Sequence, residues 1–405
     1  MTPSTSLGFV MLCHTALHRA AEVARHWAER GCPVVIHVDA RVKAWSYDKM
    51  KTELADLANV QFSERFACEW GTWGIVAATQ AASEVMLADF PSVRHVYLSS
   101  GSCLPLRPVA ELVRYLDERP RTDFIESVTT EDVGWTIGGL DVERFTLRFP
   151  FSWRKQRRLF DGYVRLQRRL RFKRRVPAGI VPHLGSQWWC LTRQTLSAIL
   201  DSPEREEIDR YFRRVWIPDE SYFQTLVRQV SAQVESRSLT LSKFDFQGKP
   251  HIFYDDHLQI LRRSDCFVAR KIWPHAERLY TTFLSDDPGG QAAAEPNPGK
   301  IDRLFARAVE VPNYTNVSNS WMMLGICQVR AGNQEEARRS LARSFELDAG
   351  NPITTFNLAL LLHQAGEHTR AQFYIRRLNN SELANAQSLW LGMQVEHALN
   401  NREVV

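Results

Sequence analysis

The first half of the chain alternates short apolar runs with longer amphipathic segments, and this alternation constrains the fold more than any other feature. The apolar runs have the length of strands, and between them apolar side chains recur at helical spacing. The expected strands are 7–14, 33–40, 93–100 and 123–127, and the expected helices are 17–31, 74–90 and 109–118. Such alternation predicts an α/β fold with a mostly parallel sheet covered by helices, and it places functional groups at the carboxyl ends of the strands.

The last part of the chain has a different composition and an internal repeat. Residues 285–300 are rich in Pro and Gly and predict a linker between a domain over 1–284 and an all-helical domain over 301–405. Within the second domain the sequence matches itself at a shift of 34 residues, which resembles the tetratricopeptide repeat. The aligned pairs are Leu324 with Leu358, Gly332 with Gly366, and Ala337 with Ala371. We expect helices at 302–311 and 381–400 to cap the repeats, and leave open whether the domain stabilises the chain or recruits a protein partner.

Composition places the 405-residue chain among globular proteins, with 44% hydrophobic and 24% charged residues, which excludes a mainly disordered chain. No run is long and apolar enough for a membrane span, and the N-terminus lacks the pattern of a secretory signal. The seven cysteines are odd in number and contain no Cys-x-x-Cys pair, so neither a disulfide framework nor a zinc site is expected. These features predict a cytoplasmic protein.

Five segments stand out as candidates for the functional site. They are HVDAR (37–41), YLSSGSCLPL (97–106), GSQWWCLTR (185–193), IPDESYFQTL (217–226) and CFVARK (266–271). Their order and spacing resemble the core-2/I-branching glycosyltransferase family, which includes the peptide O-xylosyltransferases, over about residues 5–275. The resemblance implies a GT-A-type fold of the Rossmann kind. It also implies an inverting transfer of N-acetylglucosamine or xylose from a UDP-sugar, without a metal ion.

Candidate donor-binding residues lie where strands end. Asp39 follows the second expected strand, and the resemblance places it on the UDP; the alternative is a turn residue that caps the next helix. His14 and Ser100 end the first and third expected strands, so we expect them at the carboxyl edge of the sheet. Trp70 matches a Trp-Gly element near the donor; the alternative is a role in the core.

The leaving pyrophosphate needs positive charge, and the chain contains no Asp-x-Asp pair to hold a metal ion. Arg270 and Lys271 end an apolar run and can supply that charge. The planar guanidinium of Arg270 can bind two phosphate oxygens at once, and the ammonium of Lys271 acts as a point charge. The resembled family uses basic residues in the matching segment. We therefore expect no metal and no cofactor besides the donor; the alternative is a solvated basic pair.

Glu220 is the candidate general base for the acceptor hydroxyl. Asp219 can cap the helical pattern that begins after it, which would place Glu220 in a first turn where an ionised carboxylate is favoured. An ionised Glu can take the proton of a sugar hydroxyl as that hydroxyl attacks the anomeric carbon. The resemblance gives the Glu of this motif the same role, whereas acidic residues alone are common in first turns.

The acceptor is expected beside Gln187, Trp188 and Trp189. Successive strand residues face opposite sides, so one tryptophan packs in the core and the other can stack on a sugar ring. Which of the two does so stays open. Gln187 stands where xylosyltransferases carry Asp, and Cys103 replaces an Asp that the family usually has, which weakens the choice of donor sugar.

Residues 154–175 hold eleven Lys or Arg residues and one acidic residue, Asp161. Apolar residues are interleaved with them, so the segment could lie on an anionic membrane surface, grip an anionic or lipid-linked glycan acceptor, or be a solvated excursion. The chain has no recognised nucleic-acid-binding motif, and we expect no such partner. A further alternative to the enzyme is a non-catalytic glycan- or protein-binding scaffold that acts through the helical repeats.

Overall fold

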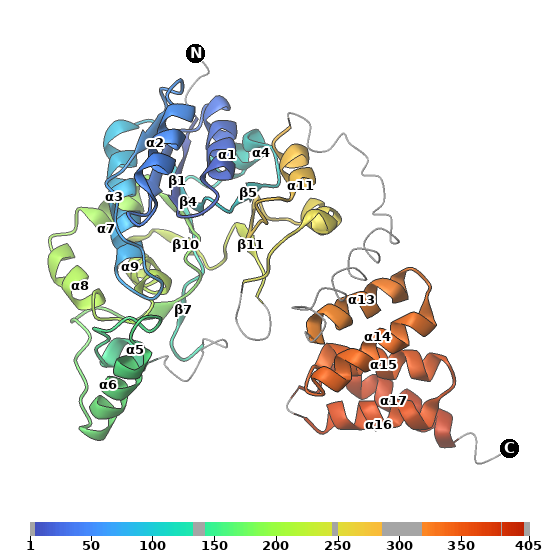
Figure 1. Ribbon diagram of the computed structural model, residues 1–405. Helices are drawn as coiled ribbons and strands as arrows, with labels where there is room; N and C mark the ends of the chain where they lie inside the picture. Colours follow the sequence, from blue (N-terminus) through green and yellow to red (C-terminus); the bar gives the residue numbers. More distant parts are fainter. Residues whose placement is uncertain (1–4, 133–141, 245–249, 286–317, 382, 401–405) are drawn as a thin grey trace. The chain divides into compact units, whose positions relative to one another are not determined.

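The computed structural model describes residues 5–132, 142–244, 250–285, 318–381 and 383–400 (Figure 1). The chain divides into two compact units, Met1–Ala292 and Ala293–Val405, which we describe separately. All but the first residue of the linker expected at 285–300 lies outside the described residues, as does the capping helix expected at 302–311. The domain boundaries therefore stay a prediction.

A seven-stranded mixed sheet forms the centre of the first unit, as predicted. Its strand order is β10-β6-β9-β4-β1-β2-β3. The strands are β1 (Leu7–Cys13), β2 (Val34–Val38), β3 (Val60–Phe62), β4 (His95–Ser100), β6 (Thr122–Phe124), β9 (Cys190–Thr192) and β10 (Gln233–Glu235). The pairs β4–β1, β1–β2 and β2–β3 are parallel, whereas β9 runs antiparallel to both its neighbours. β1, β2 and β4 are buried throughout, which explains why they read as unbroken apolar runs.

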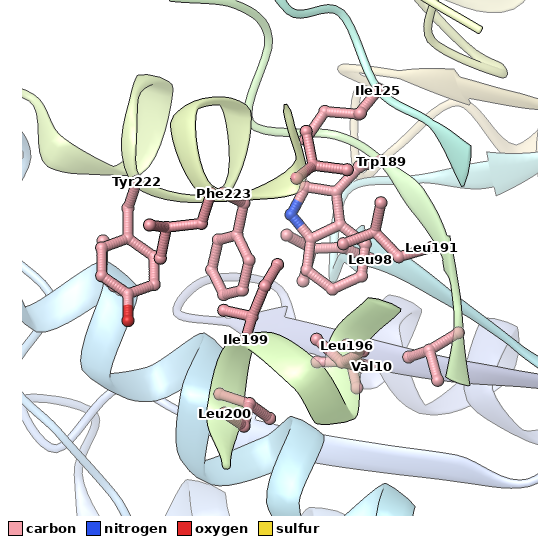
Figure 2. Close-up of a cluster of buried hydrophobic side chains, with 14 of the residues drawn as sticks. Val10, Leu98, Ile125, Trp189, Leu191, Leu196, Ile199, Leu200, Tyr222 and Phe223 are labelled. Atoms are coloured by element: carbon pink, nitrogen blue, oxygen red, sulfur yellow. The ribbon is translucent and has the colours of Figure 1, made fainter. Parts of the chain in front are cut away.

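Helices cover both faces of this sheet. On one face, Phe9 stacks on Trp27 of α1 (Leu17–Glu29) with ring centroids 3.9 Å apart. On the other face, side chains of β1, β4 and β9 pack with α3 (Gly74–Asp89), α7 (Arg193–Leu200) and α9 (Tyr222–Val230). Figure 2 shows Trp189 in this cluster, and its ring lies 5.1 Å from that of Phe223. The remaining helices of the unit are α2 (Ala44–Glu53), α4 (Val109–Asp117), α5 (Glu143–Thr146), α6 (Arg157–Arg169), α8 (Arg205–Phe212), α10 (Leu258–Arg262) and α11 (Glu277–Phe283), with 3-10 turns η1 (Pro218–Glu220) and η2 (Asp255–His257).

Two smaller sheets bring distant segments to the ends of the central strands. β12 (Val268–Arg270) lies between β11 (Thr240–Ser242) and β5 (Leu104–Pro105), and Val268 pairs antiparallel with Pro105. The Ile272 N–H donates to the Ser102 carbonyl at 3.0 Å, which ties the end of β12 to the turn after β4. β7 (Val128–Thr129) pairs with β8 (His183–Leu184) close to the third motif.

The described part of the second unit is all-helical and keeps the 34-residue period. Its helices are α13 (Ser318–Arg330), α14 (Gln334–Leu347), α15 (Pro352–Gln364), α16 (His368–Asn379) and α17 (Ala386–Asn400). Both α13 and α14 begin 34 residues before their counterparts α15 and α16. Gly332 and Gly366 take the same left-handed conformation, with φ of 83° and 77°, where the first helix of each pair ends. This confirms a helical repeat, and α17 occupies the second expected capping position; the tetratricopeptide assignment stays a prediction.

Candidate active site

The predicted donor residues meet at the carboxyl edge of the central strands. Asp39 follows β2 and is held to the end of β1 by its N–H, which donates to the Cys13 carbonyl at 2.8 Å. His14 follows β1 and stays open to solvent at this edge. Partial desolvation lowers the pKa of His14, and the Lys271 cation lowers it further. The Asp39 carboxylate opposes both effects. His14, Asp39 and Lys271 therefore lie within electrostatic reach of one another.

The Asp39 carboxylate is buried and already bound by its own turn. It accepts hydrogen bonds from the Arg41 N–H at 2.8 Å, from the Arg41 guanidinium at 2.6 Å and from the Cys68 N–H at 3.2 Å. Burial would raise the pKa of Asp39, but the Arg41 hydrogen bonds outweigh it and the pKa is lowered. The ionised Asp39 thus holds the half-exposed Arg41 at this edge. Arg41 is not among the site residues expected from the sequence. Asp39 holds its own turn, but the alternative that it caps the next helix is wrong, because Lys43 precedes α2 and no side chain caps that helix. The contact of Asp39 with UDP stays a prediction.

Arg270 and Lys271 bring positive charge to the same edge. The Arg270 guanidinium stacks on the Trp188 ring at 4.1 Å, and its Nε is buried without a hydrogen-bond partner among the described residues. Burial lowers the pKa of Arg270. Burial also lowers the pKa of Lys271, and the cations of Arg270 and Arg154 lower it further. Arg154 therefore belongs to this cation cluster, which we define as Arg154, Arg270 and Lys271.

The cation cluster lacks an internal counter-charge. Within the described ranges, no carboxylate lies at ion-pair distance from Arg270, Lys271 or Arg154. Burying cations without a partner is costly, so the arrangement favours an anion at this position. Bidentate guanidinium forks and an ammonium suit phosphate oxygens.

Trp70 connects the cation cluster to an aromatic wall. Its ring lies edge-on to Trp153 at 5.7 Å and to Trp216 at 6.0 Å, and the Arg154 guanidinium lies 5.2 Å from its centroid. The Trp70 side chain is partly buried, so it serves the packing and also faces the cations. The position of Trp70 is thus compatible with a role in the core and with a contact near the donor.

The Ser100 turn shows what Cys103 does in place of an acidic residue. The Ser100 N–H donates to the Cys103 sulfur at 3.2 Å, and the Ser100 hydroxyl lies 3.3 Å from the same atom. Burial raises the pKa of the Cys103 thiol, which keeps it neutral. Cys103 therefore stabilises the turn through its contacts with Ser100. Both side chains are buried.

Glu220 is the last residue of η1, and Ser221 separates it from α9. The expectation that Asp219 caps the following helix is wrong, because α9 begins at Tyr222 and Ser221 precedes it without a side-chain cap. Ile217 has a φ of 52°, a left-handed conformation that is rare for a β-branched residue, and it starts the tight turn in which Pro218, Asp219 and Glu220 sit. Asp219 is buried instead, and its Oδ1 has no hydrogen-bond partner among the described residues.

The environment of Glu220 suits a base. Its Oε2 lies 3.2 Å from Nη1 of Arg144, whose side chain is 2% exposed. Desolvation raises the pKa of Glu220, Arg144 opposes that shift, and the Glu126 carboxylate adds to it. Burial and the neighbouring Glu220 also raise the pKa of Asp219. Arg144 and Glu126 carry no sequence signal of their own, because each stands outside the five motifs.

The third motif packs directly against Glu220. The Gly185 N–H donates to the Glu220 carbonyl at 3.0 Å, and the Ser186 N–H donates to the Glu126 carboxylate at 3.0 Å. Gln187 follows with a partly exposed side chain. Trp188 is 6% exposed and supports Arg270, whereas Trp189 is 1% exposed and packs in the core. The structure thus brings Gln187 and Trp188 near Glu220 and the cation cluster, and it places Trp189 away from solvent.

We predict that Gly185→Ala destabilises the first unit and lowers activity. A Cβ at this position would lie 1.8 Å from the Glu126 carbonyl oxygen, so the two backbones that frame Glu220 must separate. We expect a loss of about 1–3 kcal/mol in unfolding free energy. Gly162→Ala on α6 is the matched control, because nothing lies within 4 Å of its Cβ. Denaturant unfolding followed by tryptophan fluorescence measures both, and equal stability of the two variants would contradict this packing account.

Comparisons with known proteins agree with the α/β class that this fold defines. The family model described as Core-2/I-Branching enzyme matches residues 8–264. The chain therefore belongs to the core-2/I-branching family, and its mixed sheet is GT-A-like. A family of unknown function, DUF5927, matches residues 270–316.

A curated relative and a solved structure also match. Xylosyltransferase oxt of Drosophila melanogaster is 26% identical over 199 residues, which cover 48% of this chain. The match spans 21% of that relative, so the chain covers about a fifth of its length. A structure titled assembly chaperone of RpL4 (Acl4), residues 1–338, matches with a TM-score of 0.23 and 17% identity, over 31% of this chain and 48% of that one. This structural similarity is too low to carry an argument.

Proposed function

We propose that this chain is a metal-independent inverting glycosyltransferase. It moves N-acetylglucosamine, or xylose as the second candidate, from a UDP-sugar to a hydroxyl of a glycan acceptor. Membership of the core-2/I-branching family supports transfer of a sugar. The positions of Glu220 and the cation cluster around one strand edge support the division of roles among residues.

The observation that carries the proposal is the uncompensated charge of the cation cluster, in which Arg270 and Lys271 are partly buried. Arg270 lies on Trp188 with its Nε unpartnered in the described part of the chain, and Lys271 and Arg154 add charge beside it. A UDP pyrophosphate supplies the missing negative charge. As the donor bond breaks, charge grows on the leaving phosphate oxygen, and preorganised cations stabilise it most in the transition state.

Glu220 acts as the general base in this proposal. The acceptor hydroxyl oxygen forms a bond to the anomeric carbon while the bond from that carbon to the UDP oxygen breaks. Glu220 takes the hydroxyl proton, and attack from the face opposite UDP inverts the configuration. The Arg144 guanidinium, 3.2 Å from the Glu220 carboxylate, holds it in position and favours its ionised form.

The remaining site residues surround these groups. We assign His14, Asp39 and Ser100 to the nucleotide side, with Asp39 acting through the Arg41 guanidinium that it holds. Trp70 backs the cation cluster. Gln187 and Trp188 line the acceptor side next to Glu220, and Trp189 supports them from the core.

Donor turnover tests the proposal directly. The full chain is incubated with UDP-N-acetylglucosamine or UDP-xylose in excess EDTA, and released UDP and the anomer of the released sugar are followed by proton NMR. We expect release of UDP with the β-anomer appearing first from the α-linked donor. If neither donor is bound or turned over, the enzyme proposal fails, and the scaffold that acts through the helical repeats becomes the better account.

A further inference from the structure

Helix α6 uses only one side to pack on its own unit. Phe160, Val164 and Gln167 are buried at a spacing of four and three residues, which is one face of a helix. Gln167 also clamps the Arg148 backbone, accepting from its N–H and donating to its carbonyl, both at 2.9 Å. In Figure 1, α5 and α6 form the green pair that projects from the first unit. The buried face thus fixes the direction in which the other faces of α6 point.

A second, neighbouring face of α6 carries leucines that point away from the protein. Leu159, Leu166 and Leu170 are 54%, 49% and 68% exposed. At 100° per residue these positions fall within a narrow stripe, with the partly buried Tyr163 between it and the packed face. A row of exposed leucines on one helix face is unusual in a water-facing helix and marks a contact surface.

The outer face next to this leucine stripe is cationic. Arg158, Arg165 and Arg169 occupy it, and Arg171, Lys173 and Arg175 follow in the exposed chain after the helix. No acidic side chain in the described ranges pairs with any of these six residues. The neighbouring cations are already engaged: Lys155 pairs with Glu69, Arg168 with Glu143, and Arg174 donates to the backbone of Phe145 and Tyr211.

We propose that α6 lies in the plane of an anionic membrane surface and seats the catalytic unit there. The leucine stripe enters the boundary of the acyl chains, and the six unpaired cations contact lipid phosphates beside it. A soluble polyanion would use the cations alone and leave the leucines in water, so the pairing of the two features favours a bilayer. No helix among the described residues is long and apolar enough to cross a membrane, so the contact is made at the surface.

The membrane-facing surface of α6 lies close in the sequence to the cation cluster of the candidate active site. Arg154 belongs to the same basic segment, three residues before α6, and its charge acts on Lys271 in the cation cluster. The membrane-binding helix therefore begins directly beside the donor site. A catalytic unit seated in this way would meet acceptors at the lipid surface.

Flotation of the full chain with lipid vesicles tests the proposal. Vesicles of phosphatidylglycerol and phosphatidylcholine in equal parts are compared with vesicles of phosphatidylcholine alone, at low and at high salt. We expect binding to the anionic vesicles, at least about tenfold weaker binding to the neutral ones, and partial loss in high salt because surface charges are screened. A chain that does not bind the anionic vesicles overturns the proposal.

Two sets of variants separate the apolar and the charged contributions. The triple variant Leu159→Ser, Leu166→Ser and Leu170→Ser is expected to lower vesicle binding about 100-fold while all charges remain. The triple variant Arg158→Gln, Arg165→Gln and Arg169→Gln is also expected to lower it about 100-fold, at about fivefold for each cation lost. Two matched control variants change exposed residues elsewhere on the same unit and should bind vesicles as the wild type does. They are Val230→Ser with Ile260→Ser, and Arg121→Gln with Arg263→Gln.

A soluble polyanion, dextran sulfate, provides the competing outcome. If the serine variant floats with vesicles as well as the wild type, the leucines make no contact with lipid and the proposal is wrong. In that case dextran sulfate binding that the arginine variant loses would identify an anionic polymer as the partner. Binding of UDP is measured on the same variants and should stay unchanged, so failure of the membrane proposal and failure of the donor proposal can be told apart.

Discussion

Replacing Glu220 with Gln is expected to lower sugar transfer by about 10²–10⁴-fold, the usual contribution of a positioned general base. The variant keeps the size and the backbone hydrogen bond to Gly185 but cannot accept the hydroxyl proton. UDP binding should stay within a few-fold of the wild type, because the proposal assigns Glu220 to the acceptor and not to UDP. Initial rates of UDP release and calorimetric titration with UDP measure the two effects separately.

Glu126→Gln is the matched control, since Glu126 is a second carboxylate close to Glu220 and contacts Ser186. Loss of activity in Glu126→Gln with retention in Glu220→Gln would contradict the assignment of the base.

The pH dependence gives an independent prediction for the same residue. Desolvation raises the pKa of Glu220, and the base works only when ionised. The rate should therefore be full at pH values above the raised pKa and fall as the pH drops through it, above the range of an ordinary glutamate. A rate profile measured between mildly acidic and neutral pH checks this, and the acid limb should disappear in Glu220→Gln. An acid limb in the ordinary range of a solvent-exposed carboxylate would contradict the desolvated environment.

Arg270→Gln is expected to weaken UDP binding by about 10–100-fold, the range for a lost hydrogen bond to a charged group. The same variant should also show a change in its unfolding temperature that differs between the UDP-free and the UDP-bound protein. Because Arg270 is a buried cation without a carboxylate partner among the described residues, the ligand-free variant should unfold at or above the wild-type temperature. The stabilisation that UDP adds to the wild type should be largely lost.

Thermal unfolding with and without UDP measures both parts of the Arg270 prediction. Arg237→Gln is a suitable control, since Arg237 is paired with Glu235 and does not belong to the cation cluster. A variant at position 270 that is destabilised but binds UDP normally would show that Arg270 is structural.

Much of the fold follows from local pattern. The apolar runs that became β1, β2 and β4 are buried on both faces, so their composition reveals them without any knowledge of partners. The 34-residue period of the second unit is equally visible, because Gly332 and Gly366 end corresponding helices with the same left-handed backbone. Strand ends then bring His14, Asp39 and Ser100 to one edge, as the topology of parallel strands requires.

The site residues that were missed come from long-range contacts. Arg154 lies in a basic segment whose composition suggests a membrane-facing, acceptor-gripping or solvated role, and Arg144 and Glu126 stand outside every motif. They reach the candidate site because chain segments far apart in the sequence converge on Lys271 and Glu220. The turn at Ile217 was missed for a different reason: an isoleucine carries no sequence signal for the left-handed conformation that it adopts there.

Calorimetric titration of the full chain with UDP in excess EDTA tests the central claim most directly. The account predicts binding without any divalent ion, an affinity that Mg²⁺ leaves unchanged, and much weaker binding of uridine, since the cation cluster of Arg154, Arg270 and Lys271 contacts the pyrophosphate. No binding in EDTA, with binding restored by Mg²⁺, would contradict it.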